Sequence, residues 1–209
     1  MNKSFEEALG FRHACKSFDT SKKIPHEDME FILNAARVSP SSYGLETSQY
    51  IVITNEKIKE DIQKASMNQS QVGKCSHLVI VLAGINEVKV KSGIPKERFE
   101  RIGMPKENLD FFLGLYKSFC DEHLYNEEKI YQWASKQSYL AVGNMMTAAA
   151  VKGIDSCPLE GFEKEKIEAL LELDTSLHQV ALILPFGYRK YEQSAQIRRE
   201  LNDVVQYID

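Results

Sequence analysis

The sequence predicts an α+β protein in which a mixed β-sheet is flanked by helices. Three largely apolar runs rich in β-branched residues indicate strands at residues 49–54, 76–84 and 178–187. Segments with helical periodicity lie between these strands and cover more of the chain than the strands do. Strands separated by helices are typical of a layered sandwich with the sheet in its interior.

Apolar residues three and four positions apart predict amphipathic helices. Met29, Ile32 and Ala36 share one face of such a helix. The longest helix is expected over residues 127–151, and its second half is apolar nearly all round, which favours a central buried position. Gly153 would end this helix. The expected helices cover residues 2–9, 26–37, 55–65, 107–122, 127–151 and 163–172.

Length and composition predict a single domain over residues 1–209. Of the 209 residues 43% are hydrophobic and 27% charged, as in globular proteins with a buried core. Residues 85–106 contain prolines and many charges, so we expect a short helix there at most. The polar segment 188–209 lacks core periodicity, and we expect it to be a C-terminal arm that packs on a partner subunit.

Charge and the N-terminal segment limit the expected partners and location. The formal net charge is -4, so we expect no nucleic-acid partner. The first twenty residues carry charges throughout and lack the apolar stretch of a secretory signal. The longest weakly polar run, residues 139–151, is too short to span a bilayer. We therefore expect a cytoplasmic protein with no membrane partner.

Cysteines and histidines give no sign of a disulfide or metal site. No CxxC pair occurs, and scattered cysteines in a cytoplasmic protein are expected to be reduced. Cys15 follows His13 and precedes Lys16, so a lowered thiol pKa is an alternative to a plain reduced side chain. The histidines are widely spaced, and no HExxH, Walker A, GxG or GxSxG motif is present. The cysteines are Cys15, Cys75, Cys120 and Cys157.

Two clusters of cationic residues are candidates for binding a phosphate. Arg12, His13 and Lys16 follow a short predicted helix, and their side chains can donate charge-assisted hydrogen bonds to an anion. A solvated basic turn is the alternative for this segment. Arg198 and Arg199 in the C-terminal segment form a second possible clamp.

Three other short segments are individually weak signals. Residues 39–42 (SPSS) form an ordinary turn by composition. Residues 68–72 (NQSQV) are a polar loop, although Asn and Gln amides also suit the edge of a flat heterocycle. Residues 158–162 (PLEGF) follow the long apolar helix, and Gly161 permits a close approach of main chain to a ligand.

The order and spacing of these segments together resemble the nitroreductase family of FMN-dependent, oxygen-insensitive NAD(P)H nitroreductases. The resemblance spans nearly the whole chain. It rests on RHACKSFD near the start, SPSSYG after the first amphipathic helix, NQSQV before a buried strand, AVGNMM in the central helix, SCPLEGF after it, and an arginine pair near the end. It implies an intertwined homodimer with FMN at its interface, the long apolar helix at the dimer contact, and NADH or NADPH as electron donor.

The resemblance also implies a role for each matching residue. Arg12 and Arg198 would bind the phosphate, with His13 and Ala14 beside it. Lys16 would reach the flavin edge near N1 and O2, where a cation stabilises the reduced ring. No side chain is implied as catalytic, since flavin N5 is the reactive centre. The other implied FMN contacts are Asn68 and Gln71 at the ring edge, Pro158, Leu159, Glu160 and Gly161 against the ring, and Pro40, Ser41 and Ser42 from the other subunit.

The sequence departs from the family pattern at several of these positions. Ala14 replaces a phosphate-binding Ser of many members, Gln196 replaces a Lys, and Gln71 replaces a basic residue. Arg199 or Arg189 could then contribute to the phosphate site. Residues 43–48 lack the usual Asn-x-Gln-Pro-Trp, which leaves the substrate preference open.

The implied activity is a two-electron ping-pong transfer from NAD(P)H to nitroaromatics, quinones or similar small oxidants. Lys16 and Glu160 could modulate it, the latter by orienting nicotinamide, although backbone positioning alone is an equal alternative for Glu160. Other flavin reactions on the same fold, such as enone reduction, dehalogenation or thiazoline oxidation, are alternatives, as is a flavin-binding storage or sensor protein without turnover. An aromatic substrate lid is possible, with core packing as the alternative for its first two members: Phe112, Tyr116, Phe119 and Tyr125.

Overall fold

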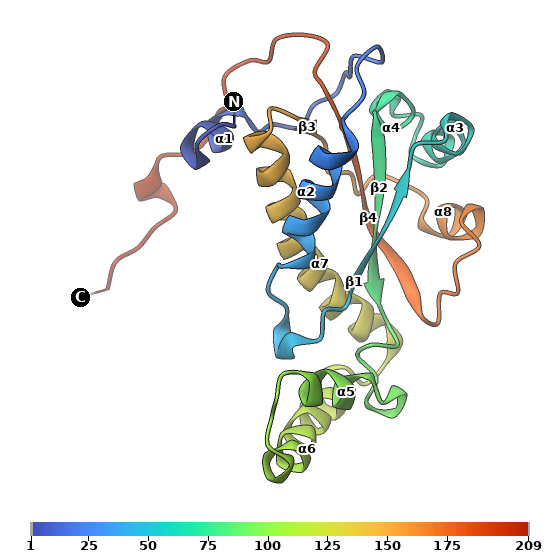
Figure 1. Ribbon diagram of the computed structural model, residues 1–209, viewed down its shortest axis with the longest axis vertical. Coiled ribbons are helices and arrows are strands. Elements are labelled where there is room, and N and C mark those ends of the chain that lie inside the picture. Colours follow the sequence, from blue (N-terminus) through green and yellow to red (C-terminus); the bar gives the residue numbers. More distant parts are fainter. Residues whose placement is uncertain (1, 209) are drawn as a thin grey trace.

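A four-stranded β-sheet forms the centre of the computed structural model, which describes residues 2–208 (Figure 1). The strand order is β1-β2-β4-β3, and every pair of neighbouring strands is antiparallel. The strands are β1 (Ser48–Ile53), β2 (His77–Gly84), β3 (Asp155–Ser156) and β4 (His178–Gly187). The α+β class is confirmed. A mixed sheet would also contain parallel neighbours, and here parallel pairing occurs in an isolated bridge between Ala14 and Ser156.

Helices make up most of the remaining regular structure. They are α1 (Phe5–Phe11), α2 (His26–Arg37), α3 (Glu56–Ala65), α4 (Ser70–Lys74), α5 (Ile94–Arg101), α6 (Lys106–His123), α7 (Glu127–Val151) and α8 (Lys164–Leu170). Short 3₁₀ turns cover Ser42–Gly44, Val90–Ser92 and Leu201–Asp203. Among residues 2–208, none of the helices has the length and apolar character needed to cross a bilayer.

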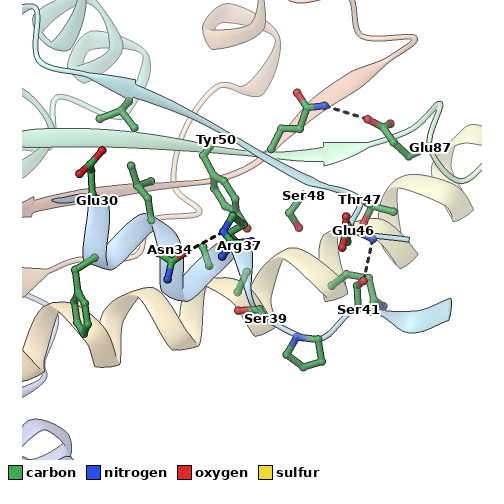
Figure 2. A pocket seen from close by; sticks show the side chains of 18 of the residues that line it. Glu30, Asn34, Arg37, Ser39, Ser41, Glu46, Thr47, Ser48, Tyr50 and Glu87 are labelled. Atoms are coloured by element: carbon green, nitrogen blue, oxygen red, sulfur yellow. Dashed lines mark hydrogen bonds between the residues drawn. The ribbon is translucent and has the colours of Figure 1, made fainter. Parts of the chain in front are cut away.

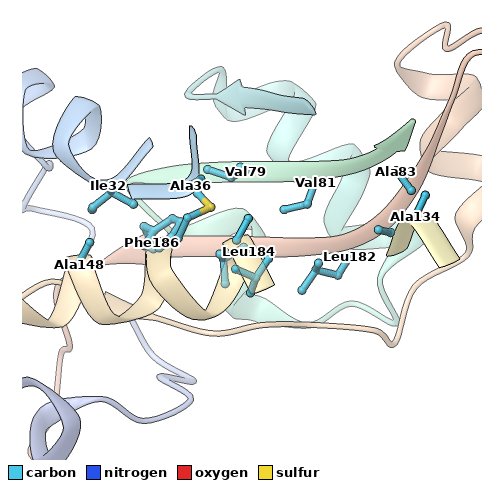
Figure 3. Packing of buried hydrophobic residues seen from close by; sticks show 14 of the residues in the cluster. Ile32, Ala36, Val79, Val81, Ala83, Ala134, Ala148, Leu182, Leu184 and Phe186 are labelled. Carbon is cyan, nitrogen blue, oxygen red and sulfur yellow. The ribbon is translucent and has the colours of Figure 1, made fainter. Parts of the chain in front are cut away.

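Both faces of the sheet are covered by helices. Val79 and Val81 of β2 pack on the side of α2 and α7, where the larger core cluster lies (Figure 3). Leu78 and Ile80 point to the opposite side and pack with residues of α3 and α8. A strand buried on both faces reads as a continuous apolar run, which explains why residues 76–84 were recognisable in the sequence.

Local capping sets the helix ends. The structure begins α1 at Phe5, three residues later than expected, because Ser4 caps it: the Ser4 hydroxyl accepts from Glu7 N, and the Glu7 carboxylate accepts from Ser4 N. Gly153 follows the last turn of α7 with a φ of 71°, which only glycine adopts at low cost. The prediction that Gly153 ends this helix is confirmed.

Helices α5 and α6 project beyond one end of the sheet (Figure 1). They have their own small core, in which Phe99 and Tyr116 are fully buried. The Tyr116 hydroxyl donates to the Val88 carbonyl at 2.6 Å and thereby ties α6 to the segment after β2. The expected short helix in residues 85–106 corresponds to α5.

The C-terminal segment leaves the body of the molecule later than expected. Residues 188–190 still pack on the N-terminal segment, since Asp19 N donates to Tyr188 O and Lys190 N donates to Ser17 O. Beyond Lys190 the chain runs past α1 and ends away from the sheet (Figure 1). Ile197 and Ile208 in this part are each 90% exposed, so the arm buries little of its apolar surface against its own subunit.

Candidate functional site

Helix α7 divides the predicted site residues into two sets. One flank of α7 contacts the loop before β1: Ser42 N donates to Gln137 Oε1 at 3.0 Å, and Asn144 Nδ2 donates to Ser39 Oγ at 2.8 Å. The other flank faces Pro158 and Glu160 through Tyr139, Val142 and Met146. Residues 40–42 and residues 158–161 of one chain therefore lie on different sides of the same helix.

The N-terminal basic segment is joined to the segment after α7 by backbone pairing. Ala14 forms a parallel bridge with Ser156, and Cys15 N donates to Ser156 O at 3.0 Å. This pairing brings Lys16 Nζ to 3.4 Å from Cys157 Sγ. Two segments more than 140 residues apart in sequence thus form one surface.

The loop before β2 reaches the same surface through glutamine side chains. Gln69 Nε2 donates to Gly161 O at 2.9 Å, and Gln71 Nε2 donates to Gln69 Oε1 at 3.1 Å. A Cβ atom on Gly161 would lie 3.4 Å from Gln69 Nε2, close to ordinary van der Waals contact. Gln71 is buried, whereas Asn68 is exposed, and the expected polar loop ends in helix α4 rather than continuing to β2.

Backbone strain occurs in this loop. Met67 and Asn68 both have a φ of 54°, in the left-handed region that non-glycine residues rarely adopt. Asn68 N donates to Gln63 O, which holds the turn closed. Strained residues of this kind are concentrated at ligand sites, because the surrounding structure must maintain them.

A buried ion pair supports the segment that carries His13. Arg189 Nη2 lies 2.7 Å from Asp155 Oδ1, and it also donates to Phe11 O at 3.2 Å. His13 Nδ1 lies 3.1 Å from Phe11 O, while His13 Nε2 is buried without a hydrogen-bond partner among residues 2–208. Arg189 is therefore already paired, and this pairing argues against the option that it binds the phosphate.

A cavity of about 340 Å³ lies between α7 and the segment after it. Its walls are Val142, Met146, Pro158 and Leu182, and a hydrogen bond from the Tyr139 hydroxyl to Glu160 Oε1 lies at its edge. Burial and the adjacent Glu160 carboxylate raise the pKa of Tyr139, so its hydroxyl remains a donor at neutral pH. This contact fixes the direction of the Glu160 side chain.

A larger groove of about 1120 Å³ lies on the other flank of α7, between α2, β1 and the loop of residues 39–48 (Figure 2). Pro40 and Ser41 line it, and Ser41 Oγ accepts from Glu46 N at 2.9 Å. Glu46 also pairs with Arg101 at 2.7 Å, which connects the loop to α5. The groove runs along β1, an edge strand of the sheet.

The C-terminal arm is attached to α1 by one side chain. Gln196 Nε2 donates to the carbonyl of Leu9 at 2.9 Å, to that of Gly10 at 3.1 Å, and to that of Arg12. Gln196 thus satisfies carbonyls at the end of α1. Arg198 Nη1 donates to the neighbouring Ile197 carbonyl, and no structural contact tests its predicted phosphate role.

The cysteines are unpaired and mostly inaccessible. Cys15, Cys75 and Cys157 are buried, and Cys120 is half-buried. Burial raises the pKa of Cys15 to about 11. Burial and the raised pKa both argue against the alternative of a reactive Cys15 with a lowered pKa.

The aromatic residues proposed for a lid have different environments. Tyr116 is fully buried and Phe112 packs beside it, so core packing is correct for these two. Phe119 stacks between Tyr43 and Trp133, with ring centroids at 5.4 and 5.9 Å. Tyr125 is 65% exposed and is the member of this group free to contact another molecule.

Comparison with known proteins identifies the family. Residues 9–188 match the sequence profile of the nitroreductase family. The chain belongs to the nitroreductase family. Members of this family are oxidoreductases. A relative from Bacillus subtilis strain 168, whose name describes YfkO as an NAD(P)H nitroreductase, is 36% identical over 97% of this chain and 96% of its own length.

Solved structures share the nitroreductase fold with this chain. A protein from Exiguobacterium sibiricum 255-15, described as a nitroreductase in complex with FMN, has a TM-score of 0.83 at 22% identity and covers 99% of this chain and 98% of its own. The enone reductase CLA-ER, from a gut-bacterial fatty acid saturation metabolism, has a TM-score of 0.82 at 19% identity. The match covers 100% of this chain and 99% of CLA-ER. At these identities the comparison establishes the fold of the nitroreductase-family protein.

The contacts that sequence reasoning missed are those that support the predicted site residues. Asp155 and Arg189 support His13, Gln69 holds Gly161, and Tyr139 holds Glu160. Each pair is far apart in sequence except Tyr139 and Glu160, and no periodicity marks any of them. Cys157 was visible within the SCPLEGF segment, but its contact with Lys16 was not.

Proposed function

We propose that this nitroreductase-family protein is a cytoplasmic FMN-dependent oxidoreductase that uses NADH or NADPH to reduce nitroaromatics, quinones or similar acceptors. The main support is the single surface formed by Lys16, Gln69, Gln71 and residues 157–161. A cation, amide side chains and a glycine-containing segment on one surface suit the polar edge and the apolar face of a flavin ring.

The donor groups of the structure fit FMN. Lys16 is exposed, and within residues 2–208 its Nζ donates only to a weak thiol acceptor, so it is available for an anionic ring edge. His13 Nε2 has no hydrogen-bond partner among residues 2–208, but it lies buried 3.8 Å from Asp155 Oδ1, so the proposed phosphate contact rests mainly on Arg12. Arg12 forms no ion pair with any residue from 2 to 208, which leaves its guanidinium free for that purpose.

Protein residues in this proposal bind and orient, while the cofactor supplies the redox chemistry. Bound FMN would provide a two-electron acceptor and donor that connects NAD(P)H oxidation to reduction of the second substrate. Lys16 would stabilise negative charge at the pyrimidine edge. Pro158, Leu159 and the main chain at Gly161 would support the ring, and Asn68 and Gln71 would read its polar edge.

Homodimerisation is part of the proposal, because the site of a single chain is incomplete. Pro40, Ser41 and Ser42 lie on the opposite flank of α7 from residues 158–161, so they reach an FMN site from a second copy more readily than within one chain. The arm beyond Lys190 exposes apolar residues, and the groove along β1 offers apolar surface and an unpaired strand edge. We propose that each arm packs on the partner subunit.

Anaerobic titration of the purified protein with NADH and with NADPH tests this function. A protein that contains FMN should bleach with at least one nucleotide, and a nitrofuran or quinone should restore the yellow colour. Restoration by an enone alone would favour the enone-reductase alternative. A yellow protein that neither nucleotide bleaches would indicate a storage or sensor role instead.

A further inference from the structure

The Cys157 thiol lies at the predicted flavin edge and is in contact with the Lys16 side chain. Cys157 is fully buried, yet Lys16 Nζ lies 3.4 Å from its Sγ. Burial raises the Cys157 pKa, and the nearby Lys16 ammonium acts in the opposite direction. The thiol therefore stays neutral and accepts a hydrogen bond from Lys16, a residue 141 positions away in sequence.

A thiol contact has a definite consequence for a lysine. The lysine side chain is a flexible chain of four methylene groups, and holding it in one conformation costs conformational entropy. Lys16 is exposed, so packing does not restrain it, and Cys157 is the acceptor that the structure provides for its ammonium group. Because an ammonium group has three donors, it can keep the sulfur contact while it donates to a ligand.

We propose that Cys157 is a positioning residue that holds the Lys16 ammonium at the pyrimidine edge and so favours reduced over oxidised FMN. This inference rests on the proposed function. Oxidised FMN presents a neutral edge, which attracts the Lys16 ammonium only weakly. Reduced FMN carries negative charge at this edge and attracts the ammonium more strongly. Removal of the sulfur should therefore weaken binding of reduced FMN and leave oxidised FMN nearly unaffected.

The test measures two equilibrium quantities on the purified protein. Titration of apoprotein gives the Kd for oxidised FMN, and the midpoint potential of the bound flavin then gives the Kd for reduced FMN. For Cys157→Ala we expect the preference for reduced FMN to fall about fivefold, the size of one modest hydrogen bond. Cys157→Ser retains an acceptor and should stay within about twofold of the wild type. Cys157→Val fills the volume without a hydrogen-bonding atom and serves if the alanine variant does not fold.

Cys15→Ala is the matched control. Cys15 is equally buried and belongs to the same core cluster, but its thiol donates to Ser17 O and does not contact Lys16. Its loss should lower thermal stability without changing the preference for reduced FMN. In a Lys16→Met background, Cys157→Ala should have no further effect on this preference, since the proposed route passes through the lysine.

The possible outcomes separate this inference from the proposed function. If the wild type binds FMN and Cys157→Ala or Cys157→Val changes the preference no more than Cys15→Ala, the positioning role is wrong while the flavin function stands. An equal effect of Cys157→Ala with and without Lys16 would also overturn it. Failure of the wild type to bind FMN would overturn both.

Discussion

Both carboxylate oxygens of Asp155 accept hydrogen bonds from Arg189: Oδ1 from Nη2 at 2.7 Å and Oδ2 from the backbone N at 2.9 Å. Asp155 lies in β3, and Arg189 follows the end of β4, so the pair closes the edge of the sheet. The Arg189 guanidinium also lies 4.0 Å from the centre of the Phe11 ring. This pair therefore connects α1, the sheet edge and the beginning of the arm.

Arg189→Ala should strongly destabilise the protein. The Asp155 side chain is only 2% exposed, and loss of the guanidinium would leave a buried carboxylate without its charged partner, held by the backbone N of residue 189. We expect the free energy of unfolding to fall by about 3 kcal/mol in urea denaturation. Arg199→Ala, in the exposed arm, is the control and should change it by less than about 0.5 kcal/mol. Equal stability of the two variants would show that the buried pair contributes nothing.

The buried thiols should make stability fall at alkaline pH. Burial raises the pKa of Cys15 to about 11 and that of Cys75 to about 12, above the ordinary value of 9.0. Because the unfolded chain loses these protons first as the pH rises, the contribution is complete below pH 9.0 and is lost towards the folded values. Urea denaturation at several pH values should show a shallower decline for Cys15→Ala than for the wild type. An identical dependence of unfolding free energy on pH in the two proteins would contradict the raised pKa of Cys15.

Thiol accessibility provides a second check on the same cysteines. With Cys15, Cys75 and Cys157 buried and their pKa values raised, native protein at pH 8 should react with a thiol reagent only slowly. Cys120, which is half-buried, should react first. Denaturation should release all the thiols. Rapid modification of Cys15 in the native protein would restore the alternative of a reactive cysteine.

Gln196→Ala should loosen the C-terminal arm. The Gln196 amide joins the arm to the last carbonyls of α1, and alanine removes these bonds without adding charge. We expect faster limited proteolysis between residues 191 and 200. Gln193→Ala is a suitable comparison, since Gln193 donates only to Tyr191 within the arm and should leave the cleavage rate unchanged. Equal rates for both variants would contradict the anchoring role.

Arg198→Ala tests the predicted phosphate contact. If Arg198 binds the phosphate of FMN, its loss should weaken FMN binding by about 1.5–3 kcal/mol, the scale of a charge-assisted hydrogen bond. Equilibrium titration of apoprotein measures this change. Arg199→Ala in parallel shows which of the two arginines contributes. An unchanged Kd for Arg198→Ala would refute its assignment.

Elements with strong periodicity were predictable from the sequence, and elements stabilised by distant contacts were not. The bounds of α2, α7 and β4 agree with the structure, because each carries a clear apolar pattern and a local end signal. Strand β3 is two residues long and exists through pairing with β4, so no local pattern marks it. The sequence predicts a loop where helix α4 forms, because Val72 is the only large apolar residue of this short segment.

The candidate site was predictable as segments but not as a geometry. Family resemblance selected Lys16, Gln71 and residues 158–161, and the structure brings these residues to one surface. The resemblance assigned Ser42 to the site of the other subunit, but it did not indicate that α7 lies between Ser42 and this surface, or that Cys157 and Tyr139 contact Lys16 and Glu160. Such relationships depend on how helices and strands pack, which a single sequence does not encode locally.

The central claim is that two copies of this chain form FMN sites at their interface. Titration of the apoprotein with FMN, combined with the molecular mass in solution, tests it most directly. We expect one FMN bound per chain, a dimeric mass, and loss of both on deletion of residues 191–209. A protein that takes up no added FMN would contradict the account, as would a deletion variant that is monomeric and binds FMN as tightly as the chain with residues 191–209 does.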